Sequence, residues 1–184
     1  MKTHNKGSHT IPQELPVPNP SIDEAFLDRL AGYLSGELTW AQVEGWTPEM
    51  LYYYAELGAN LLKTGQFAKA QVVFAFCHEV NPKDWYFSYV LGQIAFQQGH
   101  PNLAREYLEE STSLPMCRAE PHILLALLYA AQDDERASRK ALNAALEAAK
   151  RYEEYLKTGR YPVERDPAVR AEVPPTSAST NLRN

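Results

Sequence analysis

The sequence predicts an all-α protein of three stacked helix-turn-helix repeats, preceded by an N-terminal helix and closed by a C-terminal capping helix. A motif that recurs every 34 residues, together with apolar residues at helical spacing, supports this prediction for the 184-residue chain. The net charge of −5 disfavours nucleic acid as the main ligand, because phosphate binding usually needs a basic face, and no cluster of Lys and Arg is expected. Two cysteines are too few for a disulfide framework, so we expect reduced thiols.

Both ends of the chain are polar and rich in proline. We expect a flexible arm over residues 1–20 and an unstructured tail over residues 159–184, for which a peptide motif is the alternative. The arm has no apolar stretch like a signal-peptide core, and the longest apolar run, Ile123 to Ala131, is too short to span a bilayer. These observations favour a cytoplasmic protein.

Residues 21–46 are expected to hold the N-terminal helix and a short leader. Ser21 and Glu24 have the spacing of a capping box, and Gly36 is placed to end the helix. The helix has a broad apolar stripe of Ile22, Phe26, Leu27, Leu30 and Leu34. Because this stripe is broader than one repeat edge needs, we predict that it supports a homodimer. A cap on the first repeat of the same chain is the alternative.

The repeat domain is expected at residues 47–158, with units at 51–84, 85–118 and 119–150. Thr47 and Pro48 are typical of a helix start. The pair Leu57-Gly58 recurs 34 residues later as Leu91-Gly92, and again as Leu125-Ala126. The same spacing relates Gly65, Gly99 and Asp133; Ala70, Ala104 and Ser138; Phe74, Leu108 and Leu142; and Cys77, Ser111 and Ala145.

Each class of repeat position has a physical role. Glycine in the Leu-Gly pair lets the two helices of a unit approach closely, and Gly65 and Gly99 allow the turn between those helices. Phe74, Leu108 and Leu142 are expected to fill the gap between units. The third unit lacks a closing proline, so its second helix should continue from about residue 135 to 156 as a cap with a polar outer face.

No catalytic or cofactor-binding constellation is found in the sequence. There is no phosphate-binding loop and no dinucleotide-binding glycine motif. Cys77 and His78 are neighbours on a helix, so their side chains point about 100° apart and cannot form a nucleophile–base pair. Cys117 and His122 alone lack the ligands for a metal site. We therefore expect a protein-binding function, with no enzyme activity, cofactor or metal.

The 34-residue pattern resembles the tetratricopeptide repeat over residues 51–150. The resemblance implies that the first helix of each unit lines a concave groove, with positions two, five, nine and twelve pointing inward. We expect the groove to be formed by Tyr52, Ala59, Leu62, Tyr86, Tyr89, Gln93, Phe96, Ile123 and Leu127. Ala55, Glu120 and Ala130 take the remaining inward positions. This trough suits an extended protein segment with apolar anchors, although single residues could instead face the core or the N-terminal helix.

From Leu34 to Ala149 the chain also resembles the class II chaperones of bacterial type III secretion, which guard two translocator proteins. The resemblance lies in three segments: the leader from Trp46 to Tyr52, the run from Lys63 to Phe74 with Cys77 after it, and the run from Leu91 to Gly99. It implies a cytoplasmic, often dimeric chaperone that keeps a membrane-inserting client soluble until export. Pro101, the third unit and the proline-rich tail depart from the family pattern. The alternative is a scaffold or adaptor for a soluble protein partner.

Overall fold

The chain folds into helices joined by short turns. The computed structural model describes residues 17–18 and 23–159, so the expected arm and nearly all of the expected tail lie outside the described residues. The helices are α1 (Glu24–Leu34), α2 (Trp40–Glu44), α3 (Pro48–Lys63), α4 (Phe67–Val80), α5 (Trp85–Gln97), α6 (Pro101–Ser113), α7 (Ala119–Ala130) and α8 (Glu135–Thr158). The described residues contain no strand, which confirms the all-α prediction.

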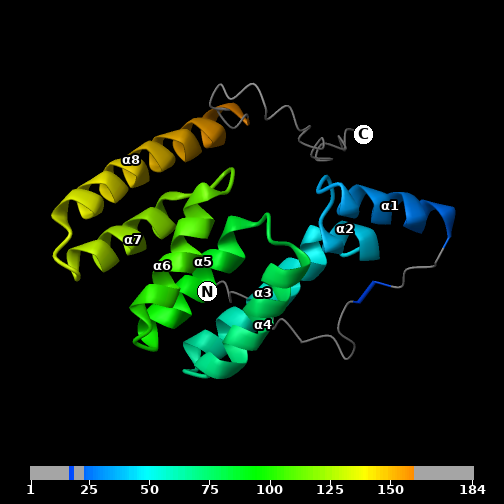
Figure 1. The fold of residues 1–184 in the computed structure, drawn as a ribbon, viewed down its shortest axis with the longest axis horizontal. Coiled ribbons are helices and arrows are strands. Elements are labelled where there is room, and N and C mark those ends of the chain that lie inside the picture. The colour runs from blue at the N-terminus through cyan, green and yellow to red at the C-terminus, as the bar shows by residue number, and fades with distance from the viewer. Residues whose placement is uncertain (1–16, 19–22, 160–184) are drawn as a thin grey trace, which may run out of the picture.

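Three helical hairpins form the stack. The pairs are α3 with α4, α5 with α6 and α7 with α8, and contacts of α4 with α5 and of α6 with α7 join the pairs. Figure 1 shows the hairpins in sequence order, with α1 and α2 beside the first pair and α8 at the opposite end. None of the described helices is both long and apolar enough to cross a membrane.

Two glycines allow the helices within a hairpin to touch. A Cβ atom added to Gly58 in α3 would lie 2.7 Å from Cε2 of Phe74, and one added to Gly92 in α5 would lie 2.9 Å from Cγ of Leu108. Both distances are too short for real carbon atoms, so a side chain at either position would push the helices apart. Phe74 and Leu108 are fully buried, as the repeat pattern predicts.

A second repeated contact ties the end of each of the first two hairpins to its beginning. The hydroxyl of Ser111 in α6 donates a hydrogen bond of 2.8 Å to the carbonyl oxygen of Trp85, the first residue of α5. One unit earlier, Sγ of Cys77 lies 3.8 Å from the carbonyl oxygen of Leu51 in α3. These equivalent positions therefore do more than fill space, because each small side chain also binds a main-chain oxygen of the paired helix.

The turns within the hairpins have the conformation that the sequence predicts. Gly65 and Gly99 have φ angles of +74° and +77°, and Asp133 at the equivalent place in the third unit has a φ of +59°. This left-handed region is costly for most side chains but accessible to Asp and Asn. No atom would crowd a Cβ at Gly65, so the backbone angle alone selects glycine there.

The third unit differs from the other two in what it buries. α8 packs on α7 through Ala141, Ala145 and Ala148, and its length agrees with the predicted capping helix. Leu142, predicted to fill a gap between units, is instead 50% exposed. That prediction is wrong because the gap needs a following hairpin, and none follows α8 among the described residues.

The N-terminal region also differs from the sequence prediction. Asp23, and not Ser21, caps α1, since its carboxylate accepts a hydrogen bond of 2.8 Å from the amide of Phe26. The segment expected as a leader contains the short helix α2, with Thr39 and Gln42 as its capping box. α1 packs chiefly on α2, and the two predicted boundaries at Gly36 and Thr47 are confirmed.

Substitutions can test the backbone conformation of the turn separately from the close contact between helices. Gly65→Val should lower the free energy of unfolding by about 1–2 kcal/mol, because a β-branched residue resists a positive φ. Ala70→Leu should lower it by about 1–3 kcal/mol, because Ala70 is fully buried in α4. Gly65→Asn is the matched control and should stay close to the parent, as Asp133 takes the same conformation in the third unit. Urea denaturation measures all three, and equal stability of parent, Gly65→Val and Ala70→Leu would contradict the repeat register.

Candidate protein-binding groove

The residues predicted to form the groove are all accessible in the structure. Tyr52, Phe96, Ile123 and Leu127 are exposed, and Ala59, Leu62, Tyr86, Tyr89 and Gln93 are half-buried. They lie on α3, α5 and α7, the first helices of the three hairpins. Ala55 was also expected to point inward, but it is buried in the cluster that contains Leu51 and Phe74.

Aromatic rings form a continuous row from α3 to α5. The rings of Tyr52 and Tyr86 stack with their centroids 6.1 Å apart. Tyr86 contacts Trp85 at 6.0 Å, and Trp85 contacts Tyr89 at 6.2 Å. These four rings stand on two neighbouring hairpins, so the row exists only when the hairpins are stacked. Aromatic pairs at such distances add stability beyond the apolar area that they bury.

Arg118 extends this row to the last helix of the stack. Its guanidinium carbon lies 4.1 Å from the ring centroid of Tyr152 in α8 and 6.0 Å from the ring of Trp85 in α5. Nη2 of Arg118 also donates a hydrogen bond of 2.7 Å to the hydroxyl of Tyr152. Beyond it, Tyr152 stacks on Tyr155 at 6.1 Å. The row of Tyr52, Tyr86, Trp85, Tyr89, Arg118, Tyr152 and Tyr155 is called the aromatic row below.

Three tyrosines of the aromatic row carry hydroxyl groups that stay uncharged at neutral pH. The hydroxyl of Tyr52 donates a hydrogen bond of 2.9 Å to the carboxylate of Asp84. Burial, and then the negative charge of Asp84, raise the pKa of Tyr52 above its usual range. Burial is also the first cause that raises the pKa of Tyr86 and Tyr89. The phenols are therefore neutral hydrogen-bonding groups beside apolar ring surface, a combination common at protein interfaces.

The sequence analysis missed several members of this surface. Trp85, Arg118, Tyr152 and Asp84 were not predicted, because only positions two, five, nine and twelve of each unit were assigned to the groove and these four residues lie at other positions. Arg118 lies in the loop before α7, and Tyr152 lies 34 residues further along the chain in α8. Trp85 was detectable as a large aromatic at the first position of a unit. The contact between Arg118 and Tyr152 has no signal in the sequence.

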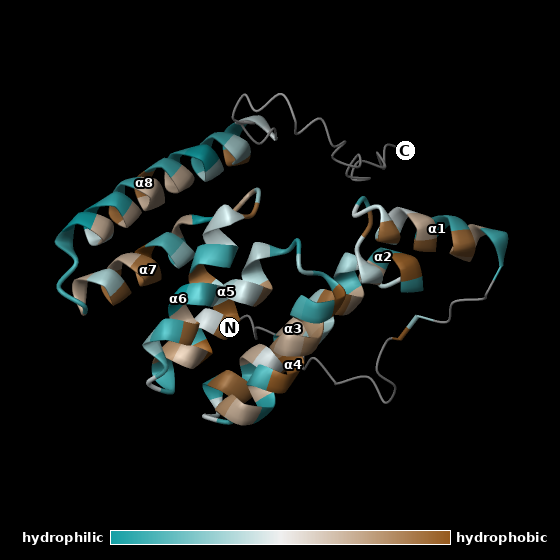
Figure 2. Cartoon of the chain, viewed as in Figure 1, coloured by the Kyte–Doolittle hydropathy of each residue, from teal (hydrophilic) through white to brown (hydrophobic). Residues whose placement is uncertain are grey.

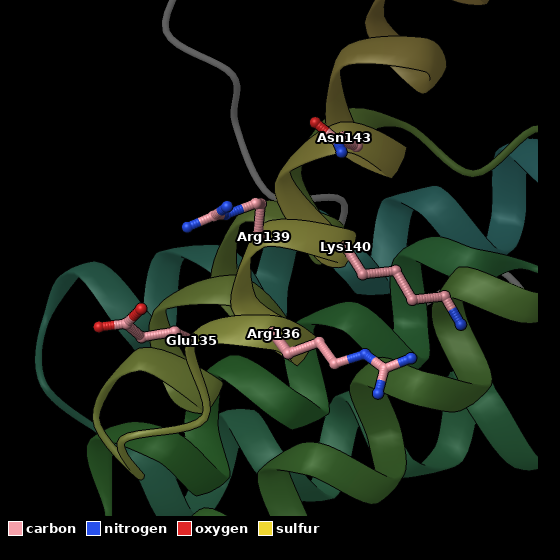
Figure 3. Close-up of a pocket in the computed structure, with 5 residues that line it drawn as sticks. All are labelled: Glu135, Arg136, Arg139, Lys140 and Asn143. Carbon is pink, nitrogen blue, oxygen red and sulfur yellow. The ribbon is translucent and has the colours of Figure 1, made fainter.

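The polar outer face predicted for α8 is basic at its start, although no Lys/Arg cluster was expected. Arg136, Arg139 and Lys140 project from the first turns of α8 around a shallow depression of about 470 Å³, which Glu135 and Asn143 also line. Figure 3 shows Glu135 and Arg139 pointing to one side of the helix, with Arg136 and Lys140 pointing to the other. Figure 2 shows hydrophilic residues alternating with hydrophobic ones along α8.

Neither cysteine lies in an arrangement suited to catalysis. Cys77 and Cys117 are both buried and free of disulfide bonds. No group of three or more His, Cys, Asp or Glu side chains that could hold a metal occurs within residues 17–18 and 23–159. The imidazole Nε2 of His78 in α4 lies 2.8 Å from a carboxylate oxygen of Glu110 in α6. This pair joins two second helices of the hairpins and includes no residue of the aromatic row.

Comparison with known proteins agrees with the repeat architecture. The tetratricopeptide-repeat model matches residues 87–115, which lie in α5, α6 and the turn after them. No curated protein matches the sequence. The chain thus contains a tetratricopeptide repeat within an all-helical stack, as the sequence analysis predicts.

Solved structures of type III secretion chaperones share this fold. The translocator chaperone SycD of Yersinia enterocolitica matches with a TM-score of 0.58 and 18% identity, over 65% of this chain and 90% of that one. SycD in complex with a peptide of the translocator YopD gives a TM-score of 0.53 and 17% identity, over 61% and 86% of the two chains. A type III secretion complex of Aeromonas hydrophila gives 0.58 and 16%, over 71% and 93%. At these identities the likeness establishes the fold.

The burial of the two thiols predicts their chemical behaviour. Burial is the first cause that raises the pKa of Cys77 and of Cys117, in each case to about 12. Both thiols should therefore react with a disulfide reagent at pH 8 only after denaturation, and a fast reaction of the native protein would contradict the described packing. Because the fold favours the protonated thiols, their contribution to stability is complete below pH 9 and is lost as the pH rises toward 12. Cys77→Ala should reduce that loss.

Proposed function

We propose that this protein is a chaperone that holds an extended segment of a hydrophobic translocator in its groove and keeps that client soluble before type III export. The aromatic row is the observation that supports this proposal. It offers accessible rings and neutral hydroxyls across three hairpins of a stack whose fold is that of SycD. In one of the matched structures a SycD chaperone is in complex with a peptide of the translocator YopD.

The chemistry of the groove favours binding over catalysis. Exposed apolar side chains such as Phe96, Ile123 and Leu127 give up their contact with water when a partner covers them, and this gain drives association. Aromatic residues that are already packed against one another lose little conformational freedom on binding. A segment in extended form can place alternate side chains along such a row. We infer that the protein acts by binding and has no enzyme activity.

A scaffold or adaptor is the second candidate function, because tetratricopeptide-type stacks serve many assemblies. The two candidates differ in the partner that they require. A chaperone for a translocator requires a client with strongly hydrophobic segments, whereas an adaptor requires a partner that is soluble alone. Capture from the native host, followed by mass spectrometry, distinguishes them through the hydropathy of the captured protein. A soluble partner without membrane-inserting segments would replace the chaperone proposal by the adaptor.

We further propose a cytoplasmic location and self-association through the apolar stripe of α1. Within the stripe, Leu27 and Leu34 are exposed, while Phe26 and Leu30 are half-buried, and Ile22 lies outside the described residues. The exposed pair leaves apolar surface on α1 that the described residues do not cover.

Truncation of two groove anchors tests the proposed client binding. Tyr86→Ala and Phe96→Ala should each weaken binding of the captured client by about 1–2 kcal/mol, because buried aromatics act as anchors at interfaces. Isothermal titration calorimetry with a soluble client segment measures the affinity, and circular dichroism checks the fold. Val72→Ala is the matched control, since Val72 is 70% exposed on α4 outside the groove. Client affinity that survives both groove substitutions would remove the groove assignment.

A further inference from the structure

We propose that α1 of one copy binds along the outer face of α8 in a second copy, so that copies associate head to tail. This inference concerns self-association and names the surface that α1 meets. It does not depend on client binding, and its tests need no client.

The outer face of α8 carries an apolar ridge that the other described residues leave exposed. Leu142, Leu146 and Ala149 follow one another at helical spacing, and all three are exposed, with Leu146 at 55%. The first of them, Leu142, repeats a position that is covered elsewhere in the stack. One unit earlier, the equivalent Leu108 is fully buried in a cluster with Leu125 and Leu128 of α7. The end of the stack therefore presents a surface of the kind on which another helix packs.

Three cations occupy the start of α8, and one of them, Arg139, lies one turn before Leu142 on the face of the ridge. Arg136, Arg139 and Lys140 form no ion pair with any described residue, whereas Lys150 and Lys157 further along α8 pair with Glu147 and Glu153. Cations near the N-terminus of a helix oppose the helix dipole, so their position costs stability in the isolated chain. A partner with carboxylates beside apolar residues would offset that cost.

The uncovered face of α1 has the matching composition. Leu27, Ala31 and Leu34 are exposed at helical spacing, with Leu34 at 78%. Glu24 and Asp28, both exposed, lie beside them in the first turns of the helix. α1 is thus a short amphipathic helix with acidic flanks, the form that commonly enters a groove or ridge on a helical partner.

One register brings both sets of residues together. With α1 parallel to α8, Leu27, Ala31 and Leu34 have the same spacing as Leu142, Leu146 and Ala149. Leu27 then meets Leu142. Leu146 meets Ala31 and Leu34 meets Ala149, so that a large side chain faces a small one at two of the three layers. In the same register Glu24 lies opposite Arg139, so that opposite charges face one another at the start of the contact. Size and charge therefore select the same alignment.

The contact has to be made between copies. Figure 1 shows α1 and α8 at opposite ends of the stack, with the α3–α4 and α5–α6 hairpins between them. α1 contacts α2 within its own chain and forms no packed pair with α8. Because the two surfaces differ, a pair joined by one contact retains a free α1 on one copy and a free α8 on the other. Such an interface is heterologous and leads to chains or closed rings, in contrast to an α1–α1 dimer.

Light scattering of the parent protein across micromolar concentrations gives the first test. The mass should rise with concentration above that of the 20.8 kDa chain. A parent that remains at the mass of one chain throughout would overturn the proposal.

Mixing two blocked variants gives the decisive test. Leu27→Glu with Leu34→Glu blocks α1, and Leu142→Glu with Leu146→Glu blocks α8. All four residues are exposed, so circular dichroism should show unchanged helicity. Each variant alone should be monomeric, and an equimolar mixture should form a dimer of two chains, because one intact α1 can meet one intact α8. If the α8-blocked variant remains a dimer alone and mixing changes nothing, α1 binds α1 and the proposal is wrong. Val72→Glu is the control and should behave as the parent.

A charge exchange tests the register itself. Glu24→Arg and Arg139→Glu should each weaken self-association by at least about tenfold, because each places like charges opposite one another. Both changes in one chain should restore the parent mass profile, since residue 24 of one copy meets residue 139 of the next. Failure of the double variant to regain association would overturn the proposed alignment.

Discussion

The contact between a small and a large residue inside each of the first two hairpins is the constraint on which the rest of the structure depends. Gly58 accepts the ring of Phe74, and Gly92 accepts Leu108, at distances that leave no room for a Cβ atom. Close helices bring the next hairpin into reach, so that Phe74 also meets Tyr86 of α5 at 6.1 Å between ring centroids. The same residue thereby joins two units. In a stack made in this way, the packing of each hairpin fixes the position of the next one.

The aromatic row is a consequence of that stacking. Tyr52 and Tyr86 come from different hairpins and stack only because α3 and α5 are held at a set separation. Arg118 then connects α5 with α8, through Trp85 on one side and Tyr152 on the other. A cation between two aromatic faces is a directional contact, and its hydrogen bond to the Tyr152 hydroxyl holds it in place. These contacts hold the rings of the aromatic row in one arrangement, which suits the proposed capture of an extended segment.

A stack of repeats must also terminate. Each unit leaves one face that only a neighbour can cover, so the first and last helices decide whether the molecule remains alone. At one end α1 and α2 lie beside the first hairpin, and Lys83 holds their connection by hydrogen bonds to the carbonyl oxygens of Gly36 and Glu37. At the other end α8 turns its alanines to α7 and its leucines outward. An ordinary cap would have a polar outer face, so this mixed surface is the feature that the self-association proposal explains.

The sequence by itself determined the architecture, because the helix-forming period and the 34-residue repeat are local properties of the chain. The spacing of Gly58 and Gly92, the turns at Gly65 and Asp133, and the start of α3 at Thr47 were all predictable, since each depends on residues a few positions away. The accessible tyrosines of α3 and α5 followed from the same register.

Only the tertiary structure decided the composition of the surfaces. Arg118 and Tyr152 lie one 34-residue period apart, but the repeat pattern does not predict that their side chains meet. The exposure of Leu142 and the burial of Ala55 depend on which neighbours are present, and the repeat pattern alone assigns a neighbour to every unit. A periodic sequence describes an unlimited stack, whereas the folded chain is finite. Its ends, and the contacts that cross between hairpins, are therefore set by packing in three dimensions.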